Sequence, residues 1–343
     1  MAEFTAISWA HHTFNCWWGC RKVSPACRFC YAERDSNRWG IDAWGSKGER
    51  RMMSEAYWRR PLTWNRKALA SGEQVRVFCA SMADVFEDHP AVVDARERLW
   101  DLIEQTPALT WMLLTKRPQH VARMARWDDD WPPNVWVGVS AETQRFADER
   151  IPVLLRVPAA VRFVSAAPLL GAVSLARYLA RPRPSSQQVA EVAVRHGIVS
   201  RQYTDVRRRH FDPPRPGVDW LITEGESGPK ARPSHPAWFR ALRNEAIQAG
   251  VPFHHKQHGE FTWDMPTAAD PISPDGRAPD WDRRPSAWVC QQDGKVVRAE
   301  ADVPDTGSWQ AVWRVGKKAA GRLLDGDLHD EFPAPRQLAG AGA

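Results

Sequence analysis

The sequence has no long apolar run and few cysteines. No stretch of about 18 uncharged apolar residues occurs in the 343 residues, so a membrane-spanning helix is not expected. The first residues lack the basic segment followed by an apolar one that marks a secretory signal. Six cysteines are too few for a disulfide-held scaffold of this length. These absences favour a cytoplasmic protein in a reducing compartment.

The composition is that of a globular chain. Hydrophobic residues make up 43% and charged residues 26%, which excludes a mostly disordered protein and supplies a large core. The 47 Lys and Arg outnumber the 41 Asp and Glu, so an anionic partner is permitted but not required. Tyrosine is scarce, with four residues, whereas tryptophan is frequent, with 19. The length suits either one α/β barrel or more than one average domain.

Short apolar runs alternate with helix-like stretches. Predicted strands lie around Thr13-Phe14 and over Gln74–Ala80, Leu109–Leu114, Asn134–Val139, Val161–Ser165, Val218–Thr223 and Val251–Gln257. Apolar residues three and four positions apart predict helices over Ala91–Gln105 and Ala237–Gly250. Strands this continuously apolar are typical of parallel strands buried on both faces. The pattern predicts an α/β fold, either a doubly wound sheet or a full or partial (β/α) barrel of about six to seven parallel strands.

Polar residues follow the predicted strands. These residues are Ser81, Asp84, Lys116, Arg117, Ser140, Glu142, Glu224, Glu226, Ser227, Lys256 and Gln257. In a barrel the carboxyl ends of all strands meet on one face, where such enzymes place their sites. Any one of these residues taken alone is equally well a solvated loop charge. Their recurrence after successive strands favours a site at the barrel mouth.

Four of the six cysteines lie within a short segment after the first predicted strand. They are Cys16, Cys20, Cys27 and Cys30, and the turn signal Ser24-Pro25 separates the second from the third. Three thiolates on one loop would leave one coordination position of a four-iron cluster open. From spacing alone two alternatives remain: a zinc site with Cys16 as fourth ligand, and buried thiols that bind no metal. The segment 16–33 is therefore a candidate metal-binding loop.

Two segments depart from the strand–helix pattern. Residues 181–216 hold eight arginines and three acidic residues, a net charge of +5, between proline-rich ends. We expect this basic insertion to be either a solvated surface helix or a contact for nucleic-acid phosphates. It interrupts a predicted barrel domain over 1–260. The extension 261–333 is expected to contain Trp-rich loops, a hairpin near Ala287–Val297 and a short basic helix over Val315–Leu324, before a disordered tail over 334–343.

The loop Cys20…Cys27-Arg28-Phe29-Cys30-Tyr31-Ala32-Glu33 resembles the cluster loop of radical S-adenosylmethionine enzymes. That superfamily commonly has three residues between the first two cysteines, whereas this chain has six. The chain is more closely similar to the phage-associated radical-SAM-like family of uncharacterised proteins, found in phages and bacteria. The matching motifs include Trp17-Trp18-Gly19-Cys20, Ser81-Met82-Ala83-Asp84-Val85-Phe86, Leu114-Thr115-Lys116-Arg117-Pro118, Val137-Gly138-Val139-Ser140, Gly225-Glu226-Ser227-Gly228 and Val315–Leu324. They span nearly the whole chain in order.

The resemblance implies an iron–sulfur enzyme with a 4Fe-4S cluster on Cys20, Cys27 and Cys30, and with Cys16 outside the ligand set. Its reduced cluster would cleave S-adenosylmethionine to a 5′-deoxyadenosyl radical that modifies an unknown substrate, for which nucleic acid or a nucleotide is the candidate class. The residues expected to contact S-adenosylmethionine are Phe29, Ser81, Met82, Asp84, Ser140 and Glu142. The residues expected to reach the substrate are Glu226, Lys256 and Gln257. The expected electron donor is a flavodoxin or ferredoxin.

A rival hypothesis belongs to another functional class. The basic insertion, the tryptophan content and the phage association would also suit a non-catalytic nucleic-acid-binding protein stabilised by zinc or by a cluster, because aromatic side chains can stack on bases. The row of polar residues after the strands favours the enzyme.

Overall fold

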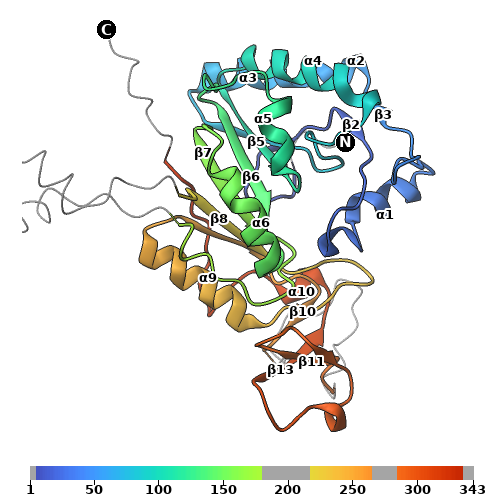
Figure 1. The fold of residues 1–343 in the computed structure, drawn as a ribbon, viewed down its shortest axis with the longest axis vertical. Helices are drawn as coiled ribbons and strands as arrows, with labels where there is room; N and C mark the ends of the chain where they lie inside the picture. The colour runs from blue at the N-terminus through green and yellow to red at the C-terminus, as the bar shows by residue number, and fades with distance from the viewer. Residues whose placement is uncertain (1–4, 180–216, 265–283, 335–343) are drawn as a thin grey trace, which may run out of the picture.

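The computed structural model describes residues 5–179, 217–264 and 284–334. In this part of the chain seven parallel strands form one curled sheet (Figure 1). They are β1 (His12–Thr13), β4 (Val75–Cys79), β5 (Leu109–Thr115), β6 (Val135–Ser140), β7 (Val161–Ala166), β8 (Trp220–Glu224) and β9 (Phe253–Gln257). The strands lie side by side in chain order. A doubly wound sheet would reverse that order, so the fold is a half-barrel and the partial-barrel prediction is confirmed at this level.

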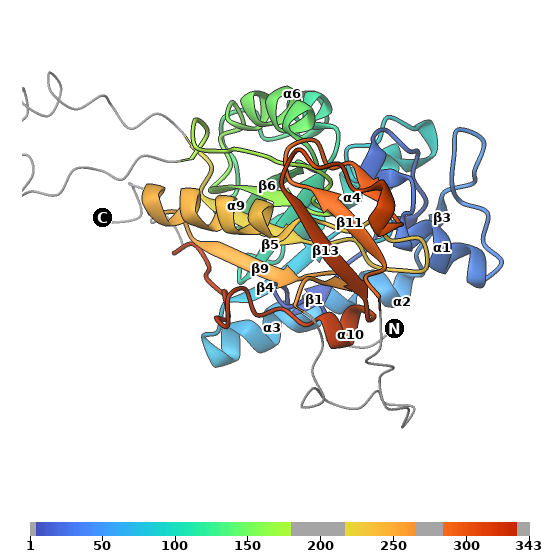
Figure 2. The same cartoon turned by 90° about the horizontal axis from the view of Figure 1, so that it is seen from below.

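Helices accompany the strands but are fewer than the alternation suggested. The longer ones are α3 (Arg60–Ser71), α4 (Val93–Glu104), α6 (Gln144–Leu154) and α9 (Pro236–Ala249). The predicted helix over 91–105 corresponds to α4, which is preceded by the 3-10 turn η2 (Pro90–Val92). The predicted helix over 237–250 corresponds to α9, which is followed by Gly250 with a φ of 65°. After β5 the chain makes only the short turns η3 (Pro118–His120) and α5 (Val121–Met124). Figures 1 and 2 show these helices along one side of the curled sheet.

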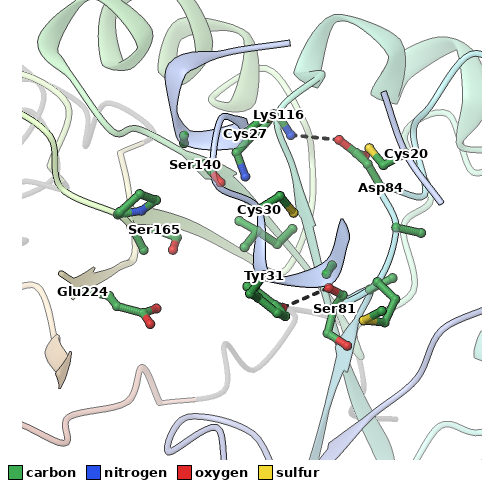
Figure 3. Close-up of a pocket in the computed structure, with 18 of the residues that line it drawn as sticks. Cys20, Cys27, Cys30, Tyr31, Ser81, Asp84, Lys116, Ser140, Ser165 and Glu224 are labelled. Atoms are coloured by element: carbon green, nitrogen blue, oxygen red, sulfur yellow. Dashed lines mark hydrogen bonds between the residues drawn. The ribbon is translucent and has the colours of Figure 1, made fainter. Parts of the chain in front are cut away.

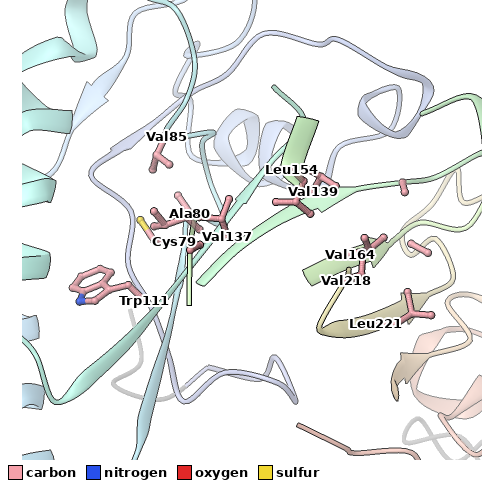
Figure 4. Packing of buried hydrophobic residues seen from close by; sticks show 14 of the residues in the cluster. Cys79, Ala80, Val85, Trp111, Val137, Val139, Leu154, Val164, Val218 and Leu221 are labelled. Atoms are coloured by element: carbon pink, nitrogen blue, oxygen red, sulfur yellow. The ribbon is translucent and has the colours of Figure 1, made fainter. Parts of the chain in front are cut away.

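Alternate side chains of each strand enter two separate hydrophobic clusters. On β5, Trp111 and Leu113 join the larger cluster, which contains helix residues such as Leu99 of α4. Met112 lies in the smaller cluster, with Leu114 packed against it. Figure 4 shows part of the larger cluster, including Val137 and Val139 of β6. The sheet is therefore buried on both faces, which explains why its strands read as continuous apolar runs.

The inner face is closed toward the amino ends of the strands by large aromatic side chains. Trp136, Phe163 and Trp220 come from β6, β7 and β8, and the ring centroids of Phe163 and Trp220 are 5.7 Å apart. Gly138 makes room for this packing, because a Cβ atom there would lie 2.3 Å from the Phe163 ring. These side chains fill the floor of the half-barrel, and a pocket lies at the carboxyl ends of the strands.

The connection from β1 to β4 carries the cysteine segment. It contains β2 (Trp17–Trp18), η1 (Pro25–Cys27), α1 (Tyr31–Arg38), β3 (Arg51–Met52) and α2 (Glu55–Trp58) before α3. β2 and β3 pair antiparallel, so the segment between them leaves the main sheet and returns. The candidate metal-binding loop therefore projects beyond the carboxyl end of β1.

The C-terminal part forms a second sheet that the sequence pattern did not predict. Its strands are β10 (Phe261–Thr262), β11 (Ala287–Cys290), β12 (Val296–Val297) and β13 (Trp309–Arg314), in the order β10-β13-β11-β12, and η5 (Glu300–Asp302) lies between β12 and β13. The hairpin expected near 287–297 is the β11–β12 pair. The predicted basic helix over 315–324 is wrong in length, because α10 covers only Lys317–Ala320 between Gly316 and Gly321, both with positive φ.

Some expectations fall outside the described residues. The basic insertion 181–216 lies there entirely, and so does nearly all of the tail 334–343. Within the ranges that the structure describes, no helix is long and apolar enough to cross a membrane.

Buried histidines join β9 to its surroundings. The ring centroids of His255 and His258 are 5.0 Å apart, and His258 lies 4.0 Å from Trp263. The Ser8 hydroxyl is 2.8 Å from His254 Nε2. Burial lowers the pKa of His254 and of His258 to about 4, and lowers that of His255 well below its ordinary value. All three are therefore neutral in the folded protein at neutral pH.

We expect stability to fall in mild acid. An unfolded histidine binds a proton near pH 6.5, whereas these buried ones do not, so the unfolded state gains protons as the pH drops. Between pH 7.5 and 5.5 the free energy of unfolding should decrease by about 1 kcal/mol for each of the three histidines. Urea unfolding at several pH values measures this slope. His258→Gln should flatten it, and a slope that is flat in the unmodified protein would contradict the prediction.

Candidate functional site

A pocket opens at the carboxyl ends of the sheet strands, beneath the cysteine loop (Figure 3). Its cavity volume is about 190 Å³, and the space that it shares with its open mouth comes to about 1180 Å³. Ten of the residues predicted for the site line it. They are Cys20, Cys27, Phe29, Cys30, Ser81, Met82, Asp84, Ser140, Glu226 and Lys256. Cys30 and Glu226 therefore lie at the same end of the sheet, as a site at the barrel mouth requires.

The polar wall of the pocket follows from strand alternation. Ser140 continues the inward-facing series of Trp136 and Gly138 on β6, and it pairs in register with Ser165 on β7. Glu224 continues the inward series of Trp220 and Ile222 on β8. On β6, β7 and β8 the inner face is thus apolar until the carboxyl end, where a polar side chain reaches the pocket.

The cysteine loop is shaped by local turn chemistry. Pro25 begins η1, with Ser24 extended before it, and the Cys27 amide donates to the Ser24 carbonyl over 2.9 Å. Cys30 stands directly before α1, whose first residue Tyr31 donates its hydroxyl to the Ser81 carbonyl over 2.9 Å. The turn and the helix start place Cys27, Phe29 and Cys30 on the pocket wall.

The Cys20 end of the loop needs a glycine. Gly19 has a φ of 119°, and a Cβ atom there would lie 2.3 Å from the Ala43 carbonyl oxygen. The Gly19 amide donates to the Met82 carbonyl over 3.0 Å, which ties the loop to the residues after β4. The glycine thus lets Cys20 approach the sheet edge closely.

The thiols lie in a mostly buried but electropositive setting. Burial raises the pKa of Cys20 to about 12, against the opposing charge of Arg117, whose Nη1 is 3.6 Å from its sulfur. Burial also raises the pKa of Cys30, with Lys116 acting in the opposite direction. Both thiols are therefore protonated at neutral pH in the metal-free protein, and binding a metal there would displace protons.

Asp84 is not free to contact a cofactor. Its carboxylate accepts from Arg117 Nη1 over 2.8 Å and from the Thr115 hydroxyl over 2.7 Å. It also accepts from the backbone amides of Lys116 and Phe86. Arg117 in turn donates to the Arg21 carbonyl over 2.6 Å. Asp84 lines the pocket, but its carboxylate oxygens already accept hydrogen bonds from the chain at the end of β5 and after it. One of these donors, Arg117, also holds the cysteine loop.

Charged residues on the β8–β9 side are paired with one another. Lys256 Nζ donates to both carboxylate oxygens of Glu224 over 2.8 Å, and Gln257 Nε2 donates to one of them over 2.5 Å. Gln257 is not among the residues that line the pocket, although its side chain reaches the same Glu224 oxygen as Lys256 does. Glu226 is held by Arg232, with Nε–Oε2 2.7 Å apart. This wall therefore offers polar atoms but little net charge.

Glu142 does not line the pocket and instead joins two elements. It is fully buried, and one carboxylate oxygen accepts from Arg150 of α6 over 2.8 Å. Arg150 Nη1 also donates to the Ser140 carbonyl. Glu142 thus fastens α6 to the end of β6, while its other oxygen has no hydrogen-bond partner among the described residues, and its contact with S-adenosylmethionine stays a prediction.

The pocket also contains polar groups that the sequence analysis did not single out. Ser165, Tyr31 and Trp9 line it. Within the described part of the chain, the Ser140 hydroxyl and the Trp9 indole nitrogen are buried without a hydrogen-bond partner. Because both residues line the pocket, these two atoms are available to a molecule bound there. The alternation of β7 would have identified Ser165.

We expect Asp84→Asn to destabilise the fold. The substitution leaves the buried Arg117 guanidinium without its shortest carboxylate contact, and breaking a buried pair costs about 3 kcal/mol. Asp101→Asn is the matched control, since Asp101 pairs with Arg126 at 2.7 Å on the surface and an exposed pair contributes under about 1 kcal/mol. Urea unfolding of both variants measures the difference, and equal losses would contradict the structural role of Asp84.

Comparison with known proteins identifies the family and nothing more specific. No curated protein and no solved structure shows significant similarity to the chain. One family model matches residues 4–333, which is nearly the entire chain, and includes the cysteine loop, the half-barrel and the C-terminal sheet. The chain belongs to the DUF5131 family, a family of proteins of unknown function.

Proposed function

We propose that this protein is a radical S-adenosylmethionine-type enzyme in which Cys20, Cys27 and Cys30 hold a 4Fe-4S cluster. The observation that carries the proposal is that all three thiols border the same pocket as the polar carboxyl ends of the strands. Cys16, in contrast, is fully buried and does not line that pocket. Three ligands and a fourth, open position are what a cluster that binds S-adenosylmethionine needs.

The residues present suit such a cluster in their chemistry. Thiolates are the usual ligands of iron–sulfur clusters, and Arg117 and Lys116 supply positive charge beside them. Within the described ranges, no group of three or more His, Cys, Asp or Glu side chains is already close enough to hold a metal ion. Cluster binding would therefore have to draw the loop over residues 20–30 together, and the loop contains only a 3-10 turn between Cys20 and Cys30.

When bound, the reduced cluster supplies the electron that cleaves the sulfonium of S-adenosylmethionine. The chain's contribution is to orient that molecule and to exclude water. Phe29 and Tyr31 provide aromatic surface beside the thiols. Asn15 holds the opposite rim, because its side-chain oxygen accepts from the Met82 amide over 2.7 Å and its nitrogen donates to the Ser81 hydroxyl over 3.1 Å.

The substrate would lie between the cofactor and the β6–β9 wall. Ser140 offers an unpartnered hydroxyl there, and the Glu224–Lys256 pair can exchange one internal contact for a contact to the substrate. Trp9, Phe78 and Leu114 line the deeper part and are apolar enough to keep water away from a reactive species. Nucleic acid or a nucleotide remains our proposed substrate class, with a flavodoxin or ferredoxin as electron donor.

The ligand assignment is tested by single Cys→Ala variants. Cys20→Ala, Cys27→Ala and Cys30→Ala should each lose most of the iron after anaerobic reconstitution, because each removes one of three ligands. Cys16→Ala and Cys79→Ala are the controls and should keep it, since both thiols lie in the core. Iron analysis and the visible absorption spectrum measure the outcome. Equal loss in Cys16→Ala, or a colourless protein with stoichiometric zinc, would favour the zinc-stabilised alternative.

The activity is tested on the reconstituted protein. With S-adenosylmethionine and a strong reductant we expect methionine and 5′-deoxyadenosine to form, detected by liquid chromatography. The Cys27→Ala variant should form neither, because it cannot hold the cluster. A protein that carries the cluster in full yet yields no 5′-deoxyadenosine under any reducing condition would contradict the catalytic proposal while leaving the cluster itself in place.

A further inference from the structure

The cysteine loop is held from two sides by arginines that are each paired with a carboxylate. On the β4–β5 side, Arg117 bonds to Asp84 and donates to the Arg21 carbonyl over 2.6 Å, directly after Cys20. A second buried pair, Arg50–Glu87 at 2.8 Å, lies beside it, and Arg50 also donates to the Ala43 and Gly48 carbonyls. The Cys20 end of the loop is thus anchored in a buried network of charges.

The stretch from Pro25 to Phe29 is also held from across the pocket mouth, by Arg232. Arg232 donates through its backbone amide, Nε and Nη2 to the Glu226 carboxylate, over 2.8, 2.7 and 2.5 Å. Its Nη2 also donates to the Pro25 carbonyl over 3.1 Å, and its guanidinium carbon lies 5.2 Å from the centre of the Phe29 ring. Arg232 therefore contacts both the turn that ends at Cys27 and the aromatic residue before Cys30.

The base of this contact is rigid. A Cβ atom on Gly225 would lie 1.8 Å from the His258 carbonyl oxygen, so the chain after β8 is pressed against the chain after β9. The Glu260 amide donates to the Glu226 carbonyl over 3.0 Å. The Glu260 carboxylate accepts from the Gly228 amide over 2.8 Å. Arg314 of β13 donates to the Gly228 carbonyl over 2.8 Å. The second sheet thus fixes the position of Glu226.

We propose that Arg232, held by Glu226, is a positioning residue that sets where Cys27, Phe29 and Cys30 lie relative to the substrate wall of the pocket. Glu226 then acts through Arg232 rather than on the substrate. What this positioning means for catalysis rests on the proposed function. The positioning itself is a property of the metal-free chain and can be measured without iron.

The test measures how fast each thiol reacts with iodoacetamide in the metal-free protein, by mass spectrometry of peptides over time. Cys20, Cys27 and Cys30 are all partly exposed, so their rates can be compared within one sample. Arg232→Gln removes the contact to Glu226 and to Pro25. The rates of Cys27 and Cys30 should rise about tenfold, as expected when a charge-assisted contact that limits local opening is lost, while the rate of Cys20 stays unchanged.

The matched control is Arg240→Gln. Arg240 is also an arginine paired with a carboxylate, but its partner is Asp325 and it makes no contact with the loop. It should leave all three rates unchanged. Arg232→Lys keeps a positive charge and a donor toward Glu226 and the Pro25 carbonyl, so it should retain part of the protection that is lost in Arg232→Gln, which a general loss of stability would not do. Equal acceleration of all three thiols, unchanged rates in Arg232→Gln, or no protection retained in Arg232→Lys would each overturn the proposal.

A second measurement separates this proposal from the proposed function. After reconstitution, Arg232→Gln should keep its iron but show an altered electron paramagnetic resonance spectrum of the reduced cluster, because two ligands are no longer held in one place. An unchanged spectrum would overturn the positioning role at the cluster. If no variant and no unmodified protein binds iron, the proposed function fails, and the thiol rates alone decide whether Arg232 positions the loop.

Discussion

All seven strands of the main sheet run in the same direction, and each sends alternate side chains to two buried faces. This constraint governs the rest of the molecule. Because both faces are buried, polar side chains are tolerated mainly where the strands end. The inner face toward the amino ends is filled by Trp136, Phe163 and Trp220, and the pocket lies at the carboxyl ends. Polar groups, pocket and cysteine loop therefore gather at one mouth, as in other barrels of parallel strands.

The same sheet edge explains why charges are buried around the pocket. Loops that leave the carboxyl ends carry backbone carbonyls that cannot all pair with strands, and buried carbonyls require donors. Arg50, Arg117 and Arg150 supply them, for the carbonyls of Ala43 and Gly48, of Arg21 and of Ser140. Each guanidinium then needs a carboxylate, because an unpaired charge is costly to bury. Glu87, Asp84 and Glu142 fill that role, so Asp84 and Glu142, which the sequence predicted as cofactor contacts, also serve as partners of buried arginines.

The sequence predicted the strands well and the helices less well, for a physical reason. Continuous apolar runs mark strands buried on both faces, so β4 to β9 were found within a few residues. The segment after β5 satisfies its backbone with the short turns η3 and α5, and no periodicity distinguishes these from a longer helix. The inward set Ser140, Ser165, Glu224 and Lys256 follows from alternation. The pairing of Glu226 with Arg232, and of Glu142 with Arg150, depends on how loops fold back, which strand patterns do not encode.

The C-terminal sheet gives the site a dependence on distant sequence. Arg314 of β13 and Glu260 before β10 both hydrogen-bond to the backbone of Gly228, close after Glu226. Arg232, the partner of Glu226, in turn donates to the carbonyl of Pro25 near the start of the chain. The loops after β8 and β9 have few alternative arrangements, because they touch at Gly225 and Gly259, where a side chain would have no space. The matched region of the family extends to residue 333 and so includes this sheet. The sheet therefore belongs with the pocket as part of one unit, since without it Glu226 would lose the backbone contacts that place it beside the cysteine loop.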